Sequence, residues 1–136
     1  MKKVFICSPY AGENKGYNEE LARQLCRYAC YEGYAPFAPH LLYPQFLSDV
    51  TGERFLGLEC GAVFLQACDE LWAYTKMSIT KGMLYEIIIS LALKDEIPVY
   101  FVDDNETGNT RFSRKFIDNE MLYHVLERNG LKTNED

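Results

Sequence analysis

The sequence predicts a single α/β domain built on a short parallel sheet. Two observations favour this class: short runs rich in β-branched and aromatic residues alternate with helical segments, and the 136 residues match the usual length of one domain. No internal repeat or low-complexity linker divides the chain. We therefore expect residues 1–136 to form one domain.

Apolar runs that end in turn residues predict the strands, and capping residues followed by amphipathic stretches predict the helices. The expected strands cover residues 3–7, 34–37, 69–74 and 97–102. The expected helices cover residues 19–32, 51–67, 82–94 and 114–128, with a polar loop from 103 to 113. The candidate N-caps are Asn18, then Thr51 or Asp49, and Thr80.

Strands that alternate with helices pair in parallel through right-handed crossovers. The expected result is a Rossmann-like or flavodoxin-like three-layer domain with strand order 2-1-3-4. Ligands of such sheets bind beyond the carboxyl ends of the strands, where the strand order reverses. Four segments should converge there, namely residues 8–17, 39–47, 75–81 and those from 103 onward.

Composition excludes several classes of function. A net charge of −6 argues against binding to long nucleic-acid backbones, which requires clustered Lys and Arg. No apolar run approaches the roughly 20 residues that cross a bilayer. Five cysteines, an odd number with no signal peptide before them, predict a reducing cytoplasm. Cys26 and Cys30 are four residues apart, but they lack further metal ligands and are expected to be structural.

Glu86 is the most informative polar residue, because the surrounding stretch from Met83 to Ile89 is otherwise apolar. At helical spacing it forms a narrow polar stripe with Gly82 and Ser90. Either this stripe faces water, or Glu86 is buried for a functional reason at the start of a helix that begins at the pocket.

Other candidates follow the strands. Ser8, Tyr10 and Gly12 offer hydroxyls and close backbone approach after the first strand, and His40 is at the rim of a Pro-rich loop. Five further polar or aromatic positions have simpler interpretations. Asp69 and Trp72 are expected to be structural, and Arg54 with Glu53 and Glu59 is expected to form a solvated helix face.

Five segments in order resemble the nucleoside 2-deoxyribosyltransferase-like superfamily, most closely its small DUF4406-type branch. The resemblance covers about residues 3–102. Its segments are ICSPYAG (6–12), PFAPHL (36–41), CDELW (68–72), GMLYE (82–86) and IPV (97–99).

This resemblance implies that Glu86 is a nucleophile that attacks the anomeric carbon of a small nucleoside or nucleotide, as in retaining glycosidases. Tyr10 would orient that glutamate. Sugar or phosphate would be held by a larger set, namely Ser8, Pro9, Gly12, His40, Ser78, Thr80 and Gly82. The superfamily also implies a homo-oligomer, and no metal, flavin or nicotinamide.

One departure concerns the general acid, since Ser78 and Thr80 stand where family enzymes often have an aspartate. Asp49 or His40 could replace it. The resemblance favours an N-glycosidase or deoxyribosyltransferase, with hydrolysis ahead of transfer. The alternatives are a nucleotide-binding module without catalysis and a self-associating structural protein with a vestigial pocket.

Overall fold

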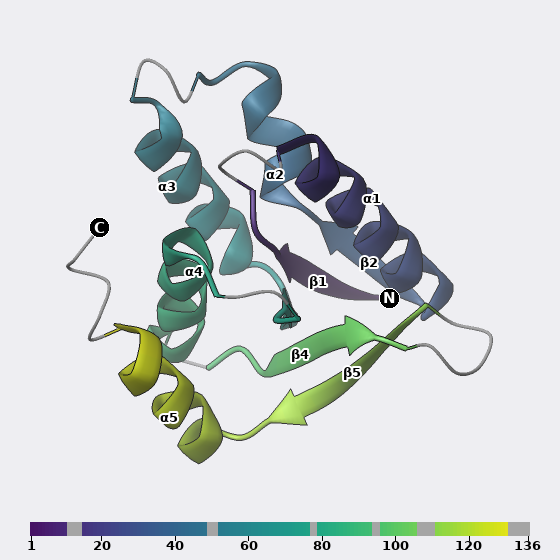
Figure 1. Cartoon of the computed structure of the whole chain (residues 1–136), viewed down its shortest axis with the longest axis vertical. Helices are drawn as coiled ribbons and strands as arrows, with labels where there is room; N and C mark the ends of the chain where they lie inside the picture. Colours follow the sequence, from purple (N-terminus) through teal and green to yellow (C-terminus); the bar gives the residue numbers. More distant parts are fainter. Residues whose placement is uncertain (11–14, 49–51, 77–78, 94–95, 106–110, 131–136) are drawn as a thin grey trace.

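A computed structural model describes residues 1–10, 15–48, 52–76, 79–93, 96–105 and 111–130. Its centre is a five-stranded sheet of order β2-β1-β3-β4-β5 (Figure 1), which confirms the expected α/β class and the order of the first four strands. The strands are β1 (Lys2–Cys7), β2 (Tyr34–Phe37), β3 (Glu70–Tyr74), β4 (Val99–Asp104) and β5 (Phe112–Ile117). The first four run parallel, and β5 pairs antiparallel with β4.

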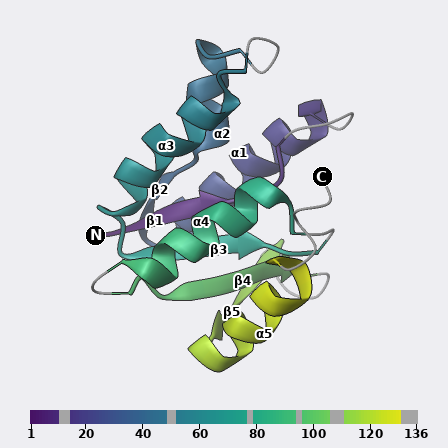
Figure 2. The same ribbon diagram turned by 90° about the vertical axis from the view of Figure 1, so that its left-hand side faces the viewer.

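Helices cover both faces of the sheet (Figure 2), as expected of a three-layer domain. They are α1 (Lys15–Tyr31), α2 (Pro39–Leu42), α3 (Arg54–Leu65), α4 (Lys81–Ala92) and α5 (Asn119–Gly130), with a 3₁₀ turn, η1, at Tyr43–Gln45. Pro39 and Pro44 lie in the first turns of α2 and η1, where the missing proline N–H costs no helical bond. The Pro-rich segment is therefore two short helical turns.

The expected polar loop and helix after residue 102 are wrong in part. Strand β4 continues to Asp104, and β5 occupies residues that were assigned to the loop and the start of the last helix. Phe112 and Ile117 are the buried ends of β5, and the residues between them are held by pairing with β4, as in Asp103 opposite Ser113. Edge-strand pairing of this kind leaves no regular apolar period in the sequence.

Asn18 is not the N-cap of the first helix, since α1 begins three residues earlier at Lys15. Its side chain is instead only 3% exposed inside the helix, and its Nδ2 donates to the Tyr10 carbonyl oxygen at 3.2 Å. Asn18 thus ties the segment after β1 to α1. The residue satisfies a loop carbonyl rather than a helix end.

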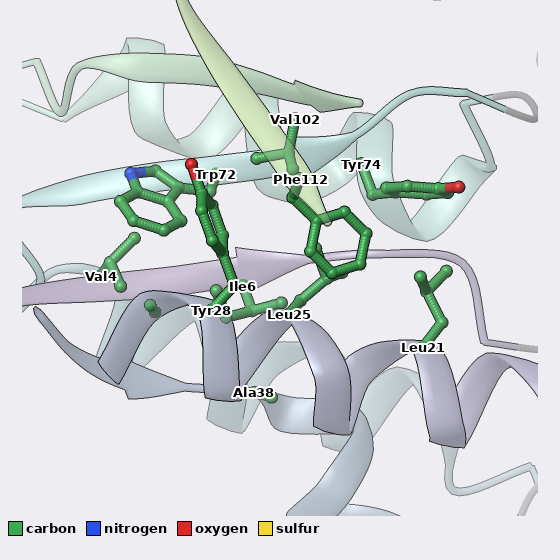
Figure 3. Packing of buried hydrophobic residues seen from close by; sticks show 11 residues of the cluster. Val4, Ile6, Leu21, Leu25, Tyr28, Ala38, Trp72, Tyr74, Val102 and Phe112 are labelled. Atoms are coloured by element: carbon green, nitrogen blue, oxygen red, sulfur yellow. The ribbon is translucent and has the colours of Figure 1, made fainter. Parts of the chain in front are cut away.

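Alternate residues of the strands supply two cores. Val4 and Ile6 point to one face, where they pack with Leu25 of α1 and with Trp72 and Val102 (Figure 3). On the opposite face, Phe5 and Cys7 of β1 pack with residues of α3, α4 and α5. Because side chains alternate between the two faces of a strand, Phe5 and Cys7 lie on the face that α4 covers, and Val4 and Ile6 lie on the other.

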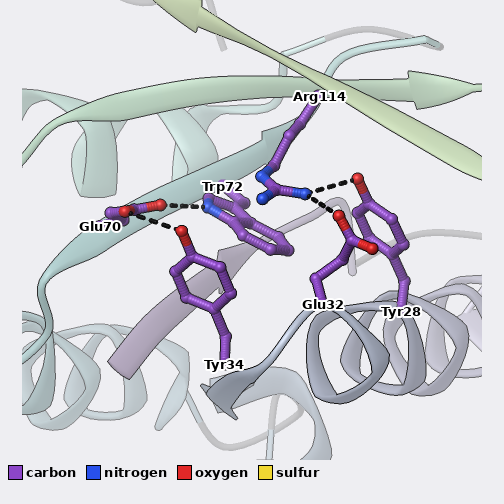
Figure 4. Close-up of polar contacts among 6 residues, drawn as sticks. All are labelled: Tyr28, Glu32, Tyr34, Glu70, Trp72 and Arg114. Atoms are coloured by element: carbon purple, nitrogen blue, oxygen red, sulfur yellow. Dashed lines mark hydrogen bonds and ion pairs between the residues drawn. The ribbon is translucent and has the colours of Figure 1, made fainter. Parts of the chain in front are cut away.

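An arginine-centred cluster joins β5 to the rest of the domain (Figure 4). The Arg114 guanidinium lies 4.5 Å from the centre of the Trp72 ring and donates to Glu32 at 2.6 Å and to Tyr28 at 2.9 Å. Glu70 accepts from Trp72 Nε1 at 2.9 Å and from the Tyr34 hydroxyl at 3.1 Å. Charged and aromatic groups from β2, β3, β5 and α1 therefore satisfy one another.

Thr80 caps α4, as expected from the sequence: its side chain accepts from the Met83 backbone N–H at 3.3 Å. Replacing Thr80 by alanine is expected to lower the free energy of unfolding by about 1 kcal/mol, since one N–H of the first turn loses its partner. Urea denaturation would measure this, with Thr80→Ser as the control that retains the acceptor. An alanine variant as stable as the serine variant would contradict the capping role.

Candidate active site

A small cavity lies at the carboxyl ends of β1 and β2, against α3 and α4. Its volume is about 40 Å³, and Tyr10, His40, Arg54 and Glu86 are among the residues that line it. That volume holds only a few water molecules, since each needs on the order of 10–15 Å³. A ligand the size of a nucleoside would therefore require the walls to move apart.

The cavity draws on fewer segments than the sequence predicts. The lining residues described come from Tyr10 after β1, from the segment 39–47, and from α3 and α4. Asp103 is exposed on β4, and its neighbour Asp104 accepts hydrogen bonds from Lys76 at 2.6 Å and from the Tyr74 hydroxyl at 3.1 Å. Among the described lining residues, none comes from the segment 75–81 or from the residues after 102.

Glu86 is buried, so the interpretation that its stripe faces water is wrong. Its side chain is 2% exposed, and Gly82 and Ser90 on the same stripe are buried as well. Burial raises the Glu86 pKa to about 8, although the Cys7 thiol, which hydrogen-bonds the carboxylate, and the charge of Arg54 act in the opposite direction. Within the described part of the chain, its Oε1 atom has no hydrogen-bond partner.

Cys7 is the side chain that interacts with the buried Glu86 from β1. Its side chain is fully buried at the end of β1, and its Sγ lies 3.7 Å from the Met83 carbonyl oxygen of α4. Burial, followed by the charge of Glu86, raises the Cys7 pKa well above its ordinary value. The group beside Glu86 is therefore a neutral thiol, which donates a hydrogen bond to Glu86 but adds no charge.

Tyr10 and His40 form a stacked pair on the cavity wall, with ring centres 4.9 Å apart. Tyr10 is 2% exposed, and no described residue bonds its hydroxyl. His40 Nε2 lies 2.8 Å from the Ser8 carbonyl oxygen, which can only accept, so this nitrogen carries the proton. The Nε2 proton of His40 is thus committed to the backbone of the first loop.

The remaining predicted site residues are only partly brought together. Ser8 and Pro9 are buried after β1, and the Ser8 Oγ has no partner among the described residues. Thr80 is bound to its own helix. Gly12 and Ser78, like the alternative acid Asp49, lie outside the described residues.

The prediction of a solvated face for Arg54 and Glu53 is wrong, although Glu59 is exposed as expected. Both residues are half-buried at the start of α3 and line the cavity with Glu86. An Nη2 atom of Arg54 would lie 3.1 Å from a Cβ added at Gly82, so the guanidinium rests on the first turn of α4. No periodicity in the sequence distinguishes these residues from Glu59, because the packing of α3 against α4 decides which ones face inward.

Asp69 and Trp72 have structural roles, as the sequence predicts. Trp72 is in the core at 1% exposure. Asp69 links the start of β3 to the start of β1, since its Oδ2 accepts a hydrogen bond from the Lys3 N–H at 2.7 Å. Within the described ranges, no three His, Cys, Asp or Glu side chains gather as metal ligands, and none of the helices is both long and apolar enough to span a bilayer.

The fold and the cavity define this chain as an α/β domain with a buried carboxylate beyond the ends of parallel strands. The chain belongs to the family described as Domain of unknown function (DUF7768), whose model matches residues 2–102. This corrects the expected DUF4406-type branch. No curated protein matches the chain.

One solved structure similar to this chain is that of a 2-deoxyribosyltransferase from the psychrotolerant bacterium Bacillus psychrosaccharolyticus. The two share 17% sequence identity, the match covers 79% of this chain and 76% of that chain, and the TM-score is 0.49. Similarity at this level carries no information about activity.

Proposed function

We propose that this protein is an N-glycosidase or deoxyribosyltransferase acting on a small nucleoside or nucleotide, with Glu86 as the nucleophile. The single observation that carries the proposal is a carboxylate 2% exposed, with one oxygen unbonded by any described residue, on the wall of a cavity. A buried group without a partner costs stability and is characteristic of functional sites. Folding alone gives no reason to retain it.

In the proposed reaction, a Glu86 oxygen forms a bond to the anomeric carbon while the bond from that carbon to the base nitrogen breaks. The bonding electrons leave with the base, which takes up a proton. Water then hydrolyses the glycosyl ester, giving the free sugar and regenerating the carboxylate; in transfer, a second base would take the place of water. Tyr10 would orient Glu86 or the sugar through a hydrogen bond from its hydroxyl. This role is supported by the burial of Tyr10 and by the lack of any other described partner for its hydroxyl.

Glu53 is our candidate for the acid that protonates the departing base. It is the other carboxylate among the described residues of the cavity wall, and its Oε1 accepts from the Ser48 backbone N–H at 2.9 Å. Retaining glycosidases use two carboxylates, one as nucleophile and one as acid. His40 is less suited, because its Nε2 proton is bound to the Ser8 carbonyl.

The test is release of free base from ribo- and deoxyribonucleosides, their monophosphates and NAD, followed by chromatography. Glu86→Gln is expected to lower release on the order of 10³-fold or more, and Glu53→Gln on the order of 10²-fold. Glu59→Gln on the exposed side of α3 is the matched control and should leave release unchanged. With a Glu86 pKa of about 8, the rate should rise with pH up to that value.

A second candidate is a binding module that holds the same ligands without cleaving them. The small volume of the cavity, about 40 Å³, favours it, since no space for a water nucleophile and a sugar is preformed. A melting temperature raised by a compound whose base is never released would support binding over catalysis. Stabilisation by none of these compounds would favour the structural alternative.

We retain the homo-oligomer as a proposal, supported by exposed apolar side chains on α3. These are Phe55, Leu56, Val63 and Phe64, between 47% and 64% exposed. A localisation in the cytoplasm stays a prediction from the sequence.

A further inference from the structure

We propose that the Arg54 guanidinium, seated on Gly82 of α4, binds an anionic group of the ligand, so that the site selects nucleoside 5′-monophosphates over nucleosides. This inference deepens the proposed function and rests on it for the identity of the ligand. The anion site itself rests on the geometry of α3 and α4.

Arg54 is a half-buried cation on the cavity wall, and its charge acts on the buried Glu86 carboxyl group. It lines the cavity, and it forms no salt bridge or hydrogen bond with any of the described residues. A half-buried guanidinium has five N–H donors in a planar fork that matches phosphate oxygens. The donors are therefore available to a ligand in the cavity.

Gly82 provides the space for this cation. A Cβ at position 82 would lie 3.1 Å from an Arg54 Nη2 atom and 3.7 Å from a Leu58 Cδ2 atom, and the first of these is tighter than an ordinary contact. Glycine within a helix lowers its stability relative to alanine. Close approach of the arginine to the backbone of α4 gives a physical reason for glycine there.

The first turn of α4 adds to the anion preference. This 12-residue helix begins at Lys81, and the unpaired N–H groups and the dipole of a helix start favour negative charge. Glu86 lies one turn further along the same face. An anion at Gly82 would therefore be separated from the reacting carboxylate by about 5–6 Å of helix rise.

Two buried, unpartnered groups indicate that the cavity is built for a ligand. Glu86 and Tyr10 both line it, each is 2% exposed, and the Glu86 Oε1 and the Tyr10 hydroxyl have no partner among the described residues. The distance from a sugar's anomeric carbon to its 5′-phosphate is of the same order as one helical turn. A monophosphate could place its sugar at Glu86 and its phosphate at Arg54.

The experiment measures binding of the four common deoxynucleosides and their 5′-monophosphates by calorimetry, using Glu86→Gln to prevent turnover, with and without a second substitution. At least one monophosphate should bind about 10-fold or more tightly than its nucleoside. Adding Arg54→Ala should lower the affinity for that monophosphate on the order of 10- to 100-fold. This is the equivalent of losing one or two hydrogen bonds to a charged group. The affinity for the nucleoside should change less than about 3-fold.

Gly82→Ala provides a second variant that retains Arg54. It should leave the fold intact or stabilise α4. Because the added Cβ displaces the guanidinium, the affinity for the monophosphate should fall more than the affinity for the nucleoside. Equal affinity for nucleoside and monophosphate, equal loss of both in Arg54→Ala, or no binding of any compound would overturn the anion site. Phosphate selectivity without base release in the Glu86 protein would overturn only the proposed catalysis.

Discussion

When the pH is raised from 4.5 to 8, the free energy of unfolding of Glu86→Gln is expected to increase, relative to that of the unsubstituted protein, by as much as about 5 kcal/mol. Burial raises the Glu86 pKa from 4.5 to about 8. In this window the folded protein retains a proton that the unfolded chain has released, so the stability of the unsubstituted protein falls as pH rises. Glutamine does not titrate, and the variant avoids this loss.

Urea unfolding at one-unit intervals from pH 4 to pH 9 would measure the effect. The buried amide adds a cost on the order of 1–3 kcal/mol that does not depend on pH, so the change of the difference with pH is the informative quantity. Exposed Glu59→Gln should give a difference that stays nearly constant. Parallel pH profiles for Glu86→Gln and the unsubstituted protein would show that Glu86 is not held in a low-dielectric site.

Replacing Arg114 by alanine is expected to lower the free energy of unfolding by about 2–3 kcal/mol, through loss of the cation–π contact and the charged hydrogen bonds. The guanidinium is 4.5 Å from the centre of the Trp72 ring, and it donates to Glu32 and Tyr28. Its side chain is 22% exposed, so water recovers only part of these interactions. Arg114→Lys should be intermediate, since lysine retains the charge but lacks the planar fork.

Lys115→Ala is the matched control, because this neighbouring side chain on β5 is exposed. It should change the stability by less than about 0.5 kcal/mol. Thermal unfolding and urea denaturation would both report the difference. If Arg114→Ala were as stable as Lys115→Ala, the cluster of Figure 4 would contribute no net stability and β5 would be held by strand pairing alone.

The contrast between these effects reflects how far the surroundings of each ionisable side chain satisfy it. Arg114 is surrounded by groups that satisfy it, whereas Glu86 has an oxygen that no described residue bonds. The first arrangement stabilises the domain and the second weakens it. Such a cost is found at sites where a ligand or a reaction supplies the missing interaction.

By itself, the sequence determined the α/β class, the first four strands and their order, and the Thr80 cap of α4. These follow from local apolar periods and capping chemistry, which act over a few residues. Glu86 also stood out locally, because a carboxylate among apolar residues is conspicuous in any fold. The resemblance to a superfamily added a possible role for it.

Only the tertiary structure decided the rest. Whether the Glu86 stripe faces water depends on the packing of α4. Whether Arg54 faces the cavity depends on how α3 packs against α4. Strand β5 exists because β4 offers it an edge, and Asn18 acts on a loop carbonyl eight residues earlier in the chain. Each of these depends on contacts between elements, which a single sequence does not encode in any local period.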